Sequence, residues 1–319
     1  MPHRLSLDHI AAAMTMIDPV FLHTPQFRAE ALEPILGCQL VVKVETVNPI
    51  RSFKGRGASY LLAQMPVGSS VICASAGNLG QAMAYAGRAR GIHVIIYASV
   101  HANPLKLARM RALGAEVHLH GDDFDAAKAE ARRVAEETDA RLVEDSLAPE
   151  TGEGAGTIGL ELLGWPEPLD AILVALGNGA LLTGVGRWVK AHAPQIQVIG
   201  VVAAGAPAMA ESWRAGRAVS TAQAQTIADG IAVRVPIPEV LADMQGTVDD
   251  VVQVRDESLV QGMRLLHQHL GLVVEPSGSV GVAALLEQPA RFAGQRVATV
   301  LCGGNLTPEQ IQCWLVELP

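Results

Sequence analysis

Short runs of apolar, often β-branched residues alternate along this chain with longer stretches whose apolar residues recur at helical spacing. Runs that are apolar throughout are typical of strands buried on both faces of a parallel sheet, and the stretches between them predict covering helices. The predicted strands are Val71–Ala74, His93–Ala98, Glu116–His120, Arg141–Glu144, Ala171–Leu176, Ile196–Val202, Val251–Val254, Val273–Glu275 and Val297–Cys302. The predicted helices are Leu79–Arg90, Pro104–Leu113, Phe124–Glu137, Leu181–His192, Leu259–Leu270, Val280–Glu287 and Pro308–Val316. The pattern therefore predicts an α/β protein built on mainly parallel sheets.

Parallel sheets bind ligands beyond the carboxyl ends of their strands, so the segments that follow the predicted strands are candidate sites. The segment Ser75-Ala76-Gly77-Asn78-Leu79-Gly80-Gln81 follows one strand and opens into a predicted helix. Its small residues expose several N–H groups at the positive end of that helix, which suits a carboxylate ligand. A plain helix cap by Ser75 or Asn78 explains the same residues, so both interpretations stay open.

Two further strand ends carry candidate residues. Gly177-Asn178-Gly179-Ala180-Leu181 is a glycine-rich turn that feeds a helix, and such turns can hold a phosphate with backbone N–H groups. A tight turn without a ligand would look the same. Cys302, which precedes Gly303 and Gly304, is either a small apolar core residue or a group in contact with a ligand.

Lys54 lies in Asn48-Pro49-Ile50-Arg51-Ser52-Phe53-Lys54-Gly55-Arg56-Gly57-Ala58, between an aromatic residue and two nearby glycines. Most lysines are solvated surface charges. In this setting, however, the glycines permit close backbone approach, and a lysine amine can form an imine with an aldehyde cofactor and can act as a base. The segment by itself is only moderately specific for that chemistry.

Composition narrows the class of protein. Half of the 319 residues are hydrophobic, only 18% are charged and the net charge is −8, which disfavours nucleic-acid binding. The longest apolar runs are far below the ~20 residues of a membrane span, and the first residues lack the apolar core of a signal peptide. The four cysteines form no CxxC pair, which fits a reducing compartment. We therefore expect a cytoplasmic protein without a membrane or nucleic-acid partner.

Two patterns resemble functional motifs, but the residues around them do not support a dinucleotide site or a metal site. The stretch 154–159 matches GxGxxG, yet it does not directly follow a strand and lacks the acidic residue that a dinucleotide site needs. The pairs His118/His120 and His267/His269 lack a third ligand or a shared face, so we expect no metal site.

Taken together, the segments occur in an order that resembles the fold-type II pyridoxal-phosphate (PLP) enzymes, within them the threonine/serine dehydratase and serine racemase group. The resemblance extends from His23-Thr24-Pro25 to Asn305. The matching features are Lys43-Val44-Glu45, 52–58, 75–78, Glu153-Gly154-Ala155-Gly156-Thr157, Thr226-Ile227-Ala228-Asp229-Gly230, Glu275-Pro276-Ser277-Gly278 and Cys302-Gly303-Gly304-Asn305. The resemblance implies two domains, each a mainly parallel twisted sheet flanked by helices, as in the tryptophan synthase β-like fold. Residues 1–47 and 147–319 would form the large PLP-binding domain, and 48–146 the small one.

The resemblance also implies roles for residues at matched positions. Lys54 would hold PLP as an imine and, once freed by the substrate amine, remove the Cα proton. The cofactor would be bound by Phe53, Lys54, Asn78, Gly177, Asn178, Gly179, Ala180, Leu181, Glu275 and Cys302. The substrate carboxylate would be bound by Ser75, Ala76, Gly77 and Asn78. Cys302 would face the pyridine nitrogen; since a thiol is a weak donor and acceptor, that nitrogen would not stay protonated, which favours elimination of a β-substituent.

The chain departs from the family pattern at several positions. Asn178 and Ala180 replace two glycines of the usual phosphate loop, although Ala is small and Asn tolerates unusual backbone angles. Ala76 stands where racemases of the group have the serine that protonates the opposite face of Cα. Val202-Ala203 follows Gly200-Val201, without the acidic residue that often binds a divalent cation. The short stretch after Asn305 also predicts no regulatory domain.

These observations predict a PLP-dependent ammonia-lyase that eliminates the β-hydroxyl of L-serine, L-threonine or a related amino acid, giving ammonia and a 2-oxo acid. The alternatives are β-replacement, a threonine synthase-like reaction, dehydration of 3-hydroxyaspartate, racemisation, or a binding protein that has lost catalysis. The residues that select the β-substituent are expected near Asp145–Gly152 and Ala203–Thr226. A homodimer is the family expectation.

Overall fold

The computed structural model describes residues 3–316. Its strands are β1 (Gln26–Arg28), β2 (Gln39–Val44), β3 (Ser70–Ala74), β4 (His93–Ala98), β5 (Glu116–Leu119), β6 (Arg141–Leu142), β7 (Ala171–Ala175), β8 (Gln197–Ala203), β9 (Asp250–Val254) and β10 (Arg296–Leu301). The α-helices of the amino-terminal half are α1 (Leu7–Met16), α2 (Glu33–Leu36), α3 (Lys54–Ala63), α4 (Asn78–Arg90), α5 (Pro104–Ala112), α6 (Phe124–Glu137) and α7 (Pro149–Leu162). Those that follow are α8 (Ala180–His192), α9 (Ala208–Ala215), α10 (Pro238–Met244), α11 (Asp256–Leu270), α12 (Val280–Glu287), α13 (Pro289–Phe292) and α14 (Pro308–Ile311). Single 3₁₀ turns, among them η3 (Asp229–Ile231) and η4 (Pro276–Gly278), complete the chain together with a π-helical turn at Gln312–Val316.

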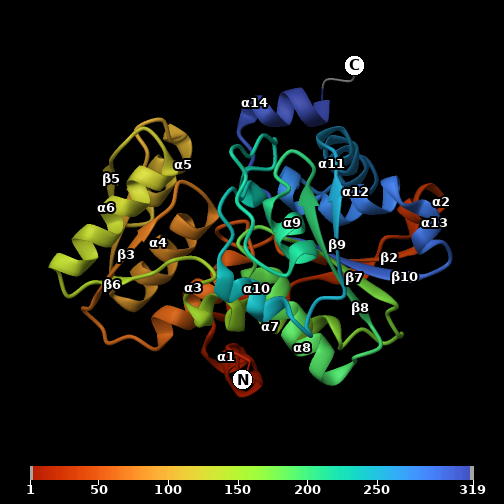
Figure 1. Ribbon diagram of the computed structural model, residues 1–319, viewed down its shortest axis with the longest axis horizontal. Coiled ribbons are helices and arrows are strands. Elements are labelled where there is room, and N and C mark those ends of the chain that lie inside the picture. The colour runs from red at the N-terminus through yellow and green to blue at the C-terminus, as the bar shows by residue number, and fades with distance from the viewer. Residues whose placement is uncertain (1–2, 317–319) are drawn as a thin grey trace.

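The strands form two separate sheets. One has four parallel strands in the order β5-β4-β3-β6, and the other has six in the order β1-β2-β10-β7-β8-β9, parallel except for the antiparallel edge strand β1. The smaller sheet, with α4, α5 and α6, lies on the left of Figure 1, and the larger sheet lies on the right. The prediction of mainly parallel sheets flanked by helices is confirmed. The domain boundaries at 47/48 and 146/147 stay predictions.

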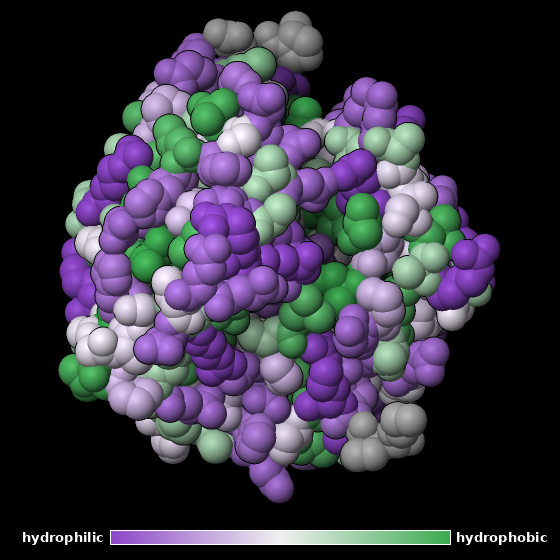
Figure 2. All heavy atoms as spheres, turned by 60° about the vertical axis from the view of Figure 1, so that its left-hand side comes forward, coloured by the Kyte–Doolittle hydropathy of each residue, from purple (hydrophilic) through white to green (hydrophobic). Residues whose placement is uncertain are grey.

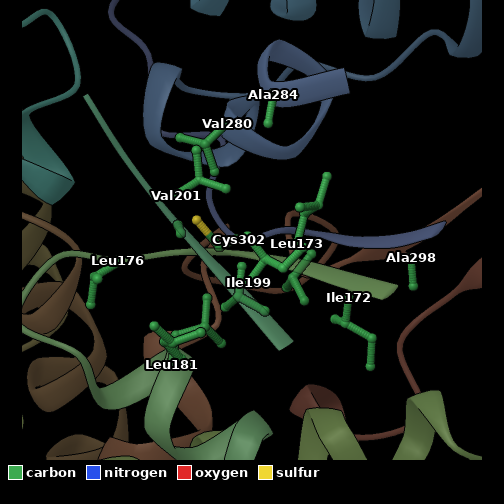
Figure 3. Packing of buried hydrophobic residues seen from close by; sticks show 14 of the residues in the cluster. Ile172, Leu173, Leu176, Leu181, Ile199, Val201, Val280, Ala284, Ala298 and Cys302 are labelled. Carbon is green, nitrogen blue, oxygen red and sulfur yellow. The ribbon is translucent and has the colours of Figure 1, made fainter. Parts of the chain in front are cut away.

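The alternation of side chains along β3 shows why each sheet is covered on both faces. Val71 and Cys73 pack into one buried cluster together with Met83 of α4, whereas Ile72 packs into another with Ala127 of α6. Successive strand residues point to opposite faces, so an entirely apolar strand needs helices on both. The larger sheet follows the same rule around its own core, of which Figure 3 shows Leu173, Ile199 and Val201.

Helix α3 connects the two cores. Phe53, at its amino-terminal end, belongs to the core of the larger sheet, while Leu61 and Leu62 belong to that of the smaller one. A Cβ on Gly57 would lie 2.7 Å from the carbonyl oxygen of Thr151 in α7, so the glycine is needed for these helices to pack. Lys54 therefore begins a helix that lies between the two sheets (Figure 1).

One predicted strand is wrong. Val273–Glu275 forms no strand; it is an irregular segment that leads into η4, and Glu275 N–H donates to the carbonyl of Gly303. A run of three residues is too short to distinguish a strand from a buried extended segment by its apolar pattern.

The surface of the molecule and the hydropathy of its helices are both relevant to membranes. The face in Figure 2 is mostly hydrophilic, and its hydrophobic residues lie in separate groups. Within residues 3–316, no helix is both long enough and apolar enough to cross a bilayer.

Candidate active site

The chain segment that carries Lys54 is attached to the end of β10. Ser52 forms a β-bridge with Gly303, and Phe53 N–H donates to the carbonyl of Cys302 at 3.0 Å. Lys54 Nζ lies 4.7 Å from the centroid of the Phe53 ring. Lys54 and Cys302, far apart in the sequence, are thus held at one end of the larger sheet, where β10 presents its carboxyl terminus.

A buried charge network fixes the first turn of α3. Arg56 is fully buried and donates to Glu45 and to Glu161, with N–O distances of 2.7–3.0 Å. Lys43 forms a second ion pair with Glu161 at 2.5 Å. Burial alone would raise the pKa of Glu161, but hydrogen bonds and charge from Arg56 and Lys43 outweigh it and hold that pKa at about 2. These four residues fix α3, and with it Lys54, against β2 and α7.

The segment Ser75–Asn78 joins β3 to α4. Ser75 Oγ accepts from the N–H groups of Gly77 and Gly80, at 3.2 and 3.0 Å, so Ser75 does act as a cap. In residues 3–316, the N–H groups of Ala76 and Asn78 meet no protein acceptor. The cap and the carboxylate site are therefore compatible, because the serine leaves neighbouring donors free at the amino terminus of α4.

Asn78 belongs to a hydrogen-bonded group with Glu275 and Asn305. Its Nδ2 donates to Glu275 Oε1 at 2.8 Å, and its Oδ1 accepts from Asn305 Nδ2 at 2.8 Å. Asn305 N–H donates to the other Glu275 oxygen at 2.9 Å. An amide nitrogen has two hydrogens, so Asn78 keeps one for a ligand. Asn305 was assigned no role from the sequence, although its position after a strand and two glycines was a signal.

Glu275 is the most perturbed carboxyl group of the site. It is buried, and burial together with the charge of Asp229 raises its pKa to about 7. The hydrogen bonds from Asn78 and Asn305 oppose that shift without cancelling it. Glu275 can therefore hold or release a proton near neutral pH.

The raised pKa of Glu275 predicts that stability depends on pH. Its pKa is about 7 in the folded protein, against 4.5 for an unperturbed glutamate. Between these values the folded protein retains a proton that the unfolded chain has lost, so this group's stabilisation is full below about pH 4.5 and is lost by about pH 7. The expected loss is ~3 kcal/mol. Urea unfolding of wild type and Glu275→Gln across this range should show the loss in wild type alone; identical pH profiles would contradict it.

Cys302 is a neutral thiol at the edge of the large core. Its Sγ donates to the carbonyl of Ser277 at 3.4 Å, and it lies near Ile199 and Leu173 in the core cluster (Figure 3). Burial, together with the nearby charge of Glu275, raises the pKa of Cys302 well above its ordinary value. The structure thus places Cys302 in the large core, directly after β10, and its contact with a ligand stays a prediction.

The glycine-rich turn lies between β7 and α8. Gly179 has φ +103°, a conformation that only glycine adopts without strain. Ala180 N–H donates to Ser146 Oγ at 3.0 Å. Over the described residues, the N–H groups of Gly177, Asn178 and Gly179 donate to no protein acceptor. Three free amides at the amino terminus of α8 fit a phosphate.

Asp145 begins the segment Asp145–Gly152, which was expected to help select the β-substituent, but the sequence assigned it no contact with Lys54. Its Oδ2 lies 2.6 Å from Lys54 Nζ, and its Oδ1 is buried without a hydrogen-bond partner in the described chain. It comes shortly after β6, where the rule that ligands lie beyond strand ends could have identified it. Ser146, which contacts the glycine-rich turn, lies in the same segment and was likewise assigned no role of its own.

The two rejected motifs have structural explanations. The GxGxxG stretch is helical within α7, and its glycines allow close packing: a Cβ on Gly154 would lie 2.6 Å from Gly57 Cα. His267 and His269 lie on α11, and His118 stacks on Tyr97.

Comparison with known proteins places these features in a family. Residues 17–303 match the family model described as "Pyridoxal-phosphate dependent enzyme". An L-threonine ammonia-lyase of Thermotoga maritima is 34% identical over 310 residues, covering 96% of this chain and 77% of that enzyme. A serine racemase of Oryza sativa subsp. indica is 31% identical, covering 93% and 90%. The chain spans only 52% of the mitochondrial threonine dehydratase of Schizosaccharomyces pombe.

Solved structures agree with this placement. Maize serine racemase is similar with a TM-score of 0.92 and 29% identity, over 98% of this chain and 97% of that one. A threonine deaminase from T.th. has a TM-score of 0.89 and 33% identity, over 95% of this chain and 99% of that one.

Proposed function

Because the chain belongs to the pyridoxal-phosphate-dependent enzymes, we propose that it is an ammonia-lyase that eliminates the β-hydroxyl of L-serine, L-threonine or a related β-hydroxy amino acid. The observation that carries this proposal is the position of Lys54. Its amine contacts Asp145, whose neighbour Ser146 accepts from Ala180 N–H of the glycine-rich turn, and its chain segment is hydrogen-bonded to Cys302 through Phe53 N–H.

The residues present fit PLP. The free N–H groups of Gly177, Asn178 and Gly179 would bind its phosphate, and the Phe53 ring would lie against the pyridine. Ser277 Oγ, buried without a partner among the described residues, lies in the segment that Cys302 contacts. When bound, PLP supplies the aldehyde that takes up the substrate amine and an electron-withdrawing ring that stabilises negative charge at Cα.

The protein's own residues would perform the remaining tasks. The N–H groups of Ala76 and Asn78 would hold the substrate carboxylate, which orients the Cα proton towards Lys54. Lys54 would take that proton as a base. Cys302, as a neutral thiol, would leave the pyridine nitrogen unprotonated, which favours prompt loss of the β-substituent over longer-lived carbanion chemistry.

The overall reaction balances without an external oxidant or reductant. The Cα proton and the β-hydroxyl leave as water, and the enamine that results takes up water and releases ammonia. The product is a 2-oxo acid with the carbon skeleton of the substrate.

The test of this function is direct. Purified protein supplied with PLP is expected to convert L-serine or L-threonine into equal amounts of ammonia and the matching 2-oxo acid. Chromatography of the products, with the D-amino acids as a parallel panel, separates the other reactions. Accumulation of D-serine without a 2-oxo acid would identify a racemase, and a cofactor-loaded protein that releases no ammonia would overturn the proposal.

The assembly and location of the protein belong to the same proposal. By its resemblance to this family we take the chain to be a homodimer that works in the cytoplasm on a small-molecule amino acid. Residues 1–47 with 147–319, and residues 48–146, are proposed as its large and small domains.

A further inference from the structure

The carboxylate of Asp145 is the charged group nearest to the reactive amine. Asp145 Oδ2 lies 2.6 Å from Lys54 Nζ, and both side chains are partly buried, at 17% and 18% exposure. The second oxygen, Oδ1, is buried and has no hydrogen-bond partner within residues 3–316. Half of this carboxylate is therefore available to a donor that the protein does not supply.

The backbone around Asp145 is held firmly. The next residue, Ser146, is buried with φ +68°, a strained conformation for a residue other than glycine. Its N–H donates to Thr151 Oγ1 at 3.1 Å, and its carbonyl accepts from Arg4 at 2.7 Å. Arg4 is itself fixed by an ion pair with Asp243. Strain persists where surrounding contacts over-determine it, and here those contacts keep Asp145 in place.

Occupation of the site changes what this carboxylate can contact. An ammonium at Lys54 has three N–H donors, whereas the free amine that acts as the Cα base has two. Asp145 can then keep a bond to Lys54 through Oδ2, while Oδ1 stays open to another donor. A substrate whose Cα proton faces Lys54 places its β-substituent only two bonds from Cα, within reach of the same carboxylate.

We infer that Asp145 is the specificity-determining residue of this site, selecting a β-substituent that donates hydrogen bonds or is cationic and rejecting an anionic one. This inference rests on the proposed function, because it assumes that an amino acid is bound at Lys54. A hydroxyl or ammonium group completes the bonding of Oδ1, whereas a β-carboxylate lies against a like charge in a partly buried place. Serine and threonine are then accepted, and 3-hydroxyaspartate is rejected.

Glu144 provides a matched control. It is the neighbouring acidic residue, but it forms ion pairs with Lys128 and Arg132 on the outer side of α6, at 2.9 and 2.8 Å. Glu144→Gln removes the same charge as Asp145→Asn, one residue away, without touching Lys54.

The experiment compares three small amino acids whose β-substituents differ in charge. They are L-2,3-diaminopropionate, L-serine and L-aspartate. Binding to the PLP-loaded protein is followed through the absorption change of the cofactor, which requires no turnover. The preference of wild type for the first two over L-aspartate is expected to shrink at least ~10-fold in Asp145→Asn and to stay unchanged in Glu144→Gln. Asp145→Ala serves as a second variant and should lose the same preference.

Each possible outcome of this experiment either supports or overturns the role of Asp145. An unchanged ratio of dissociation constants in both Asp145 variants overturns the inference, even where all affinities fall together, since a purely structural role would lower binding without regard to ligand charge. Tighter binding of L-aspartate than of L-serine by wild type also overturns it. If wild type releases no ammonia yet shows the charge-dependent binding, the proposed lyase function fails while the role of Asp145 stands.

Discussion

Lys54→Ala is expected to abolish the absorption band of the lysine-bound cofactor and to lower the elimination rate at least ~10³-fold. Alanine cannot join the aldehyde of PLP and cannot accept the Cα proton, so both roles are lost in one change. The measurement is the absorption spectrum of the purified, PLP-supplied variant together with 2-oxo acid release. The effect should be the largest of any single change at the site.

Lys128→Ala is the control for that experiment. Lys128 is also a partly exposed lysine paired with a carboxylate, Glu144, but it lies on α6 and has no contact with Lys54 or Asp145 among the described ion pairs. Its spectrum and activity should match those of wild type. A Lys54→Ala protein that still eliminated at a substantial fraction of the wild-type rate would exclude Lys54 as the base, whatever its spectrum.

Arg56→Ala is expected to lower the free energy of unfolding by ~3–5 kcal/mol. Arg56 is fully buried, and its removal leaves the carboxylates of Glu45 and Glu161 without their main partner in a water-excluded place. The network also fixes the first turn of α3, so binding of PLP at Lys54 should weaken as well. Urea unfolding monitored by circular dichroism measures the first effect, and PLP titration the second.

Arg133 is the matched control for Arg56, because it also pairs with two carboxylates, those of Glu130 and Glu137, but on the exposed face of α6. Arg133→Ala should leave the unfolding free energy almost unchanged, since exposed ion pairs are solvated before and after folding. Equal losses in the two variants would show that burial of the Arg56 network contributes nothing. Arg56→Lys should fall between them, because an ammonium cannot bind two carboxylates in the fork geometry of a guanidinium.

Most of the helices and strands that the sequence predicted are correct, because their period is a local property. The helices Phe124–Glu137 and Val280–Glu287 begin and end at the residues predicted, since amphipathic spacing and turn residues lie within each segment. The failure at Val273–Glu275 has the opposite cause. The N–H of Glu275 donates to Gly303 and its C=O accepts from Gly278 in η4, so neither joins a strand, and a pattern of three residues cannot predict those partners.

The residues of the candidate site likewise fall into those that the sequence could identify and those that it could not. The strand-end segments at Ser75, Gly177 and Cys302, and the glycines around Lys54, could be identified because their chemistry depends on residues adjacent in the sequence. Asp145 could not be linked to Lys54, since 91 residues separate them and the contact exists only because the segment after β6 lies beside the start of α3. The Arg56 network is of the same kind, with one partner directly after β2 and another on α7.

The sequence by itself thus determined the fold class, the strand ends that could form a site, and the candidate lysine Lys54. These features depend on the periods of strands and helices and on turn residues, which involve only residues close together in the sequence. Only the tertiary structure decided that Asp145 faces Lys54, that Glu275 is held by Asn78 and Asn305, and that Arg56 is buried between two carboxylates. Charge, burial and hydrogen bonding depend on which side chains meet in space, and those meetings join residues far apart in the sequence.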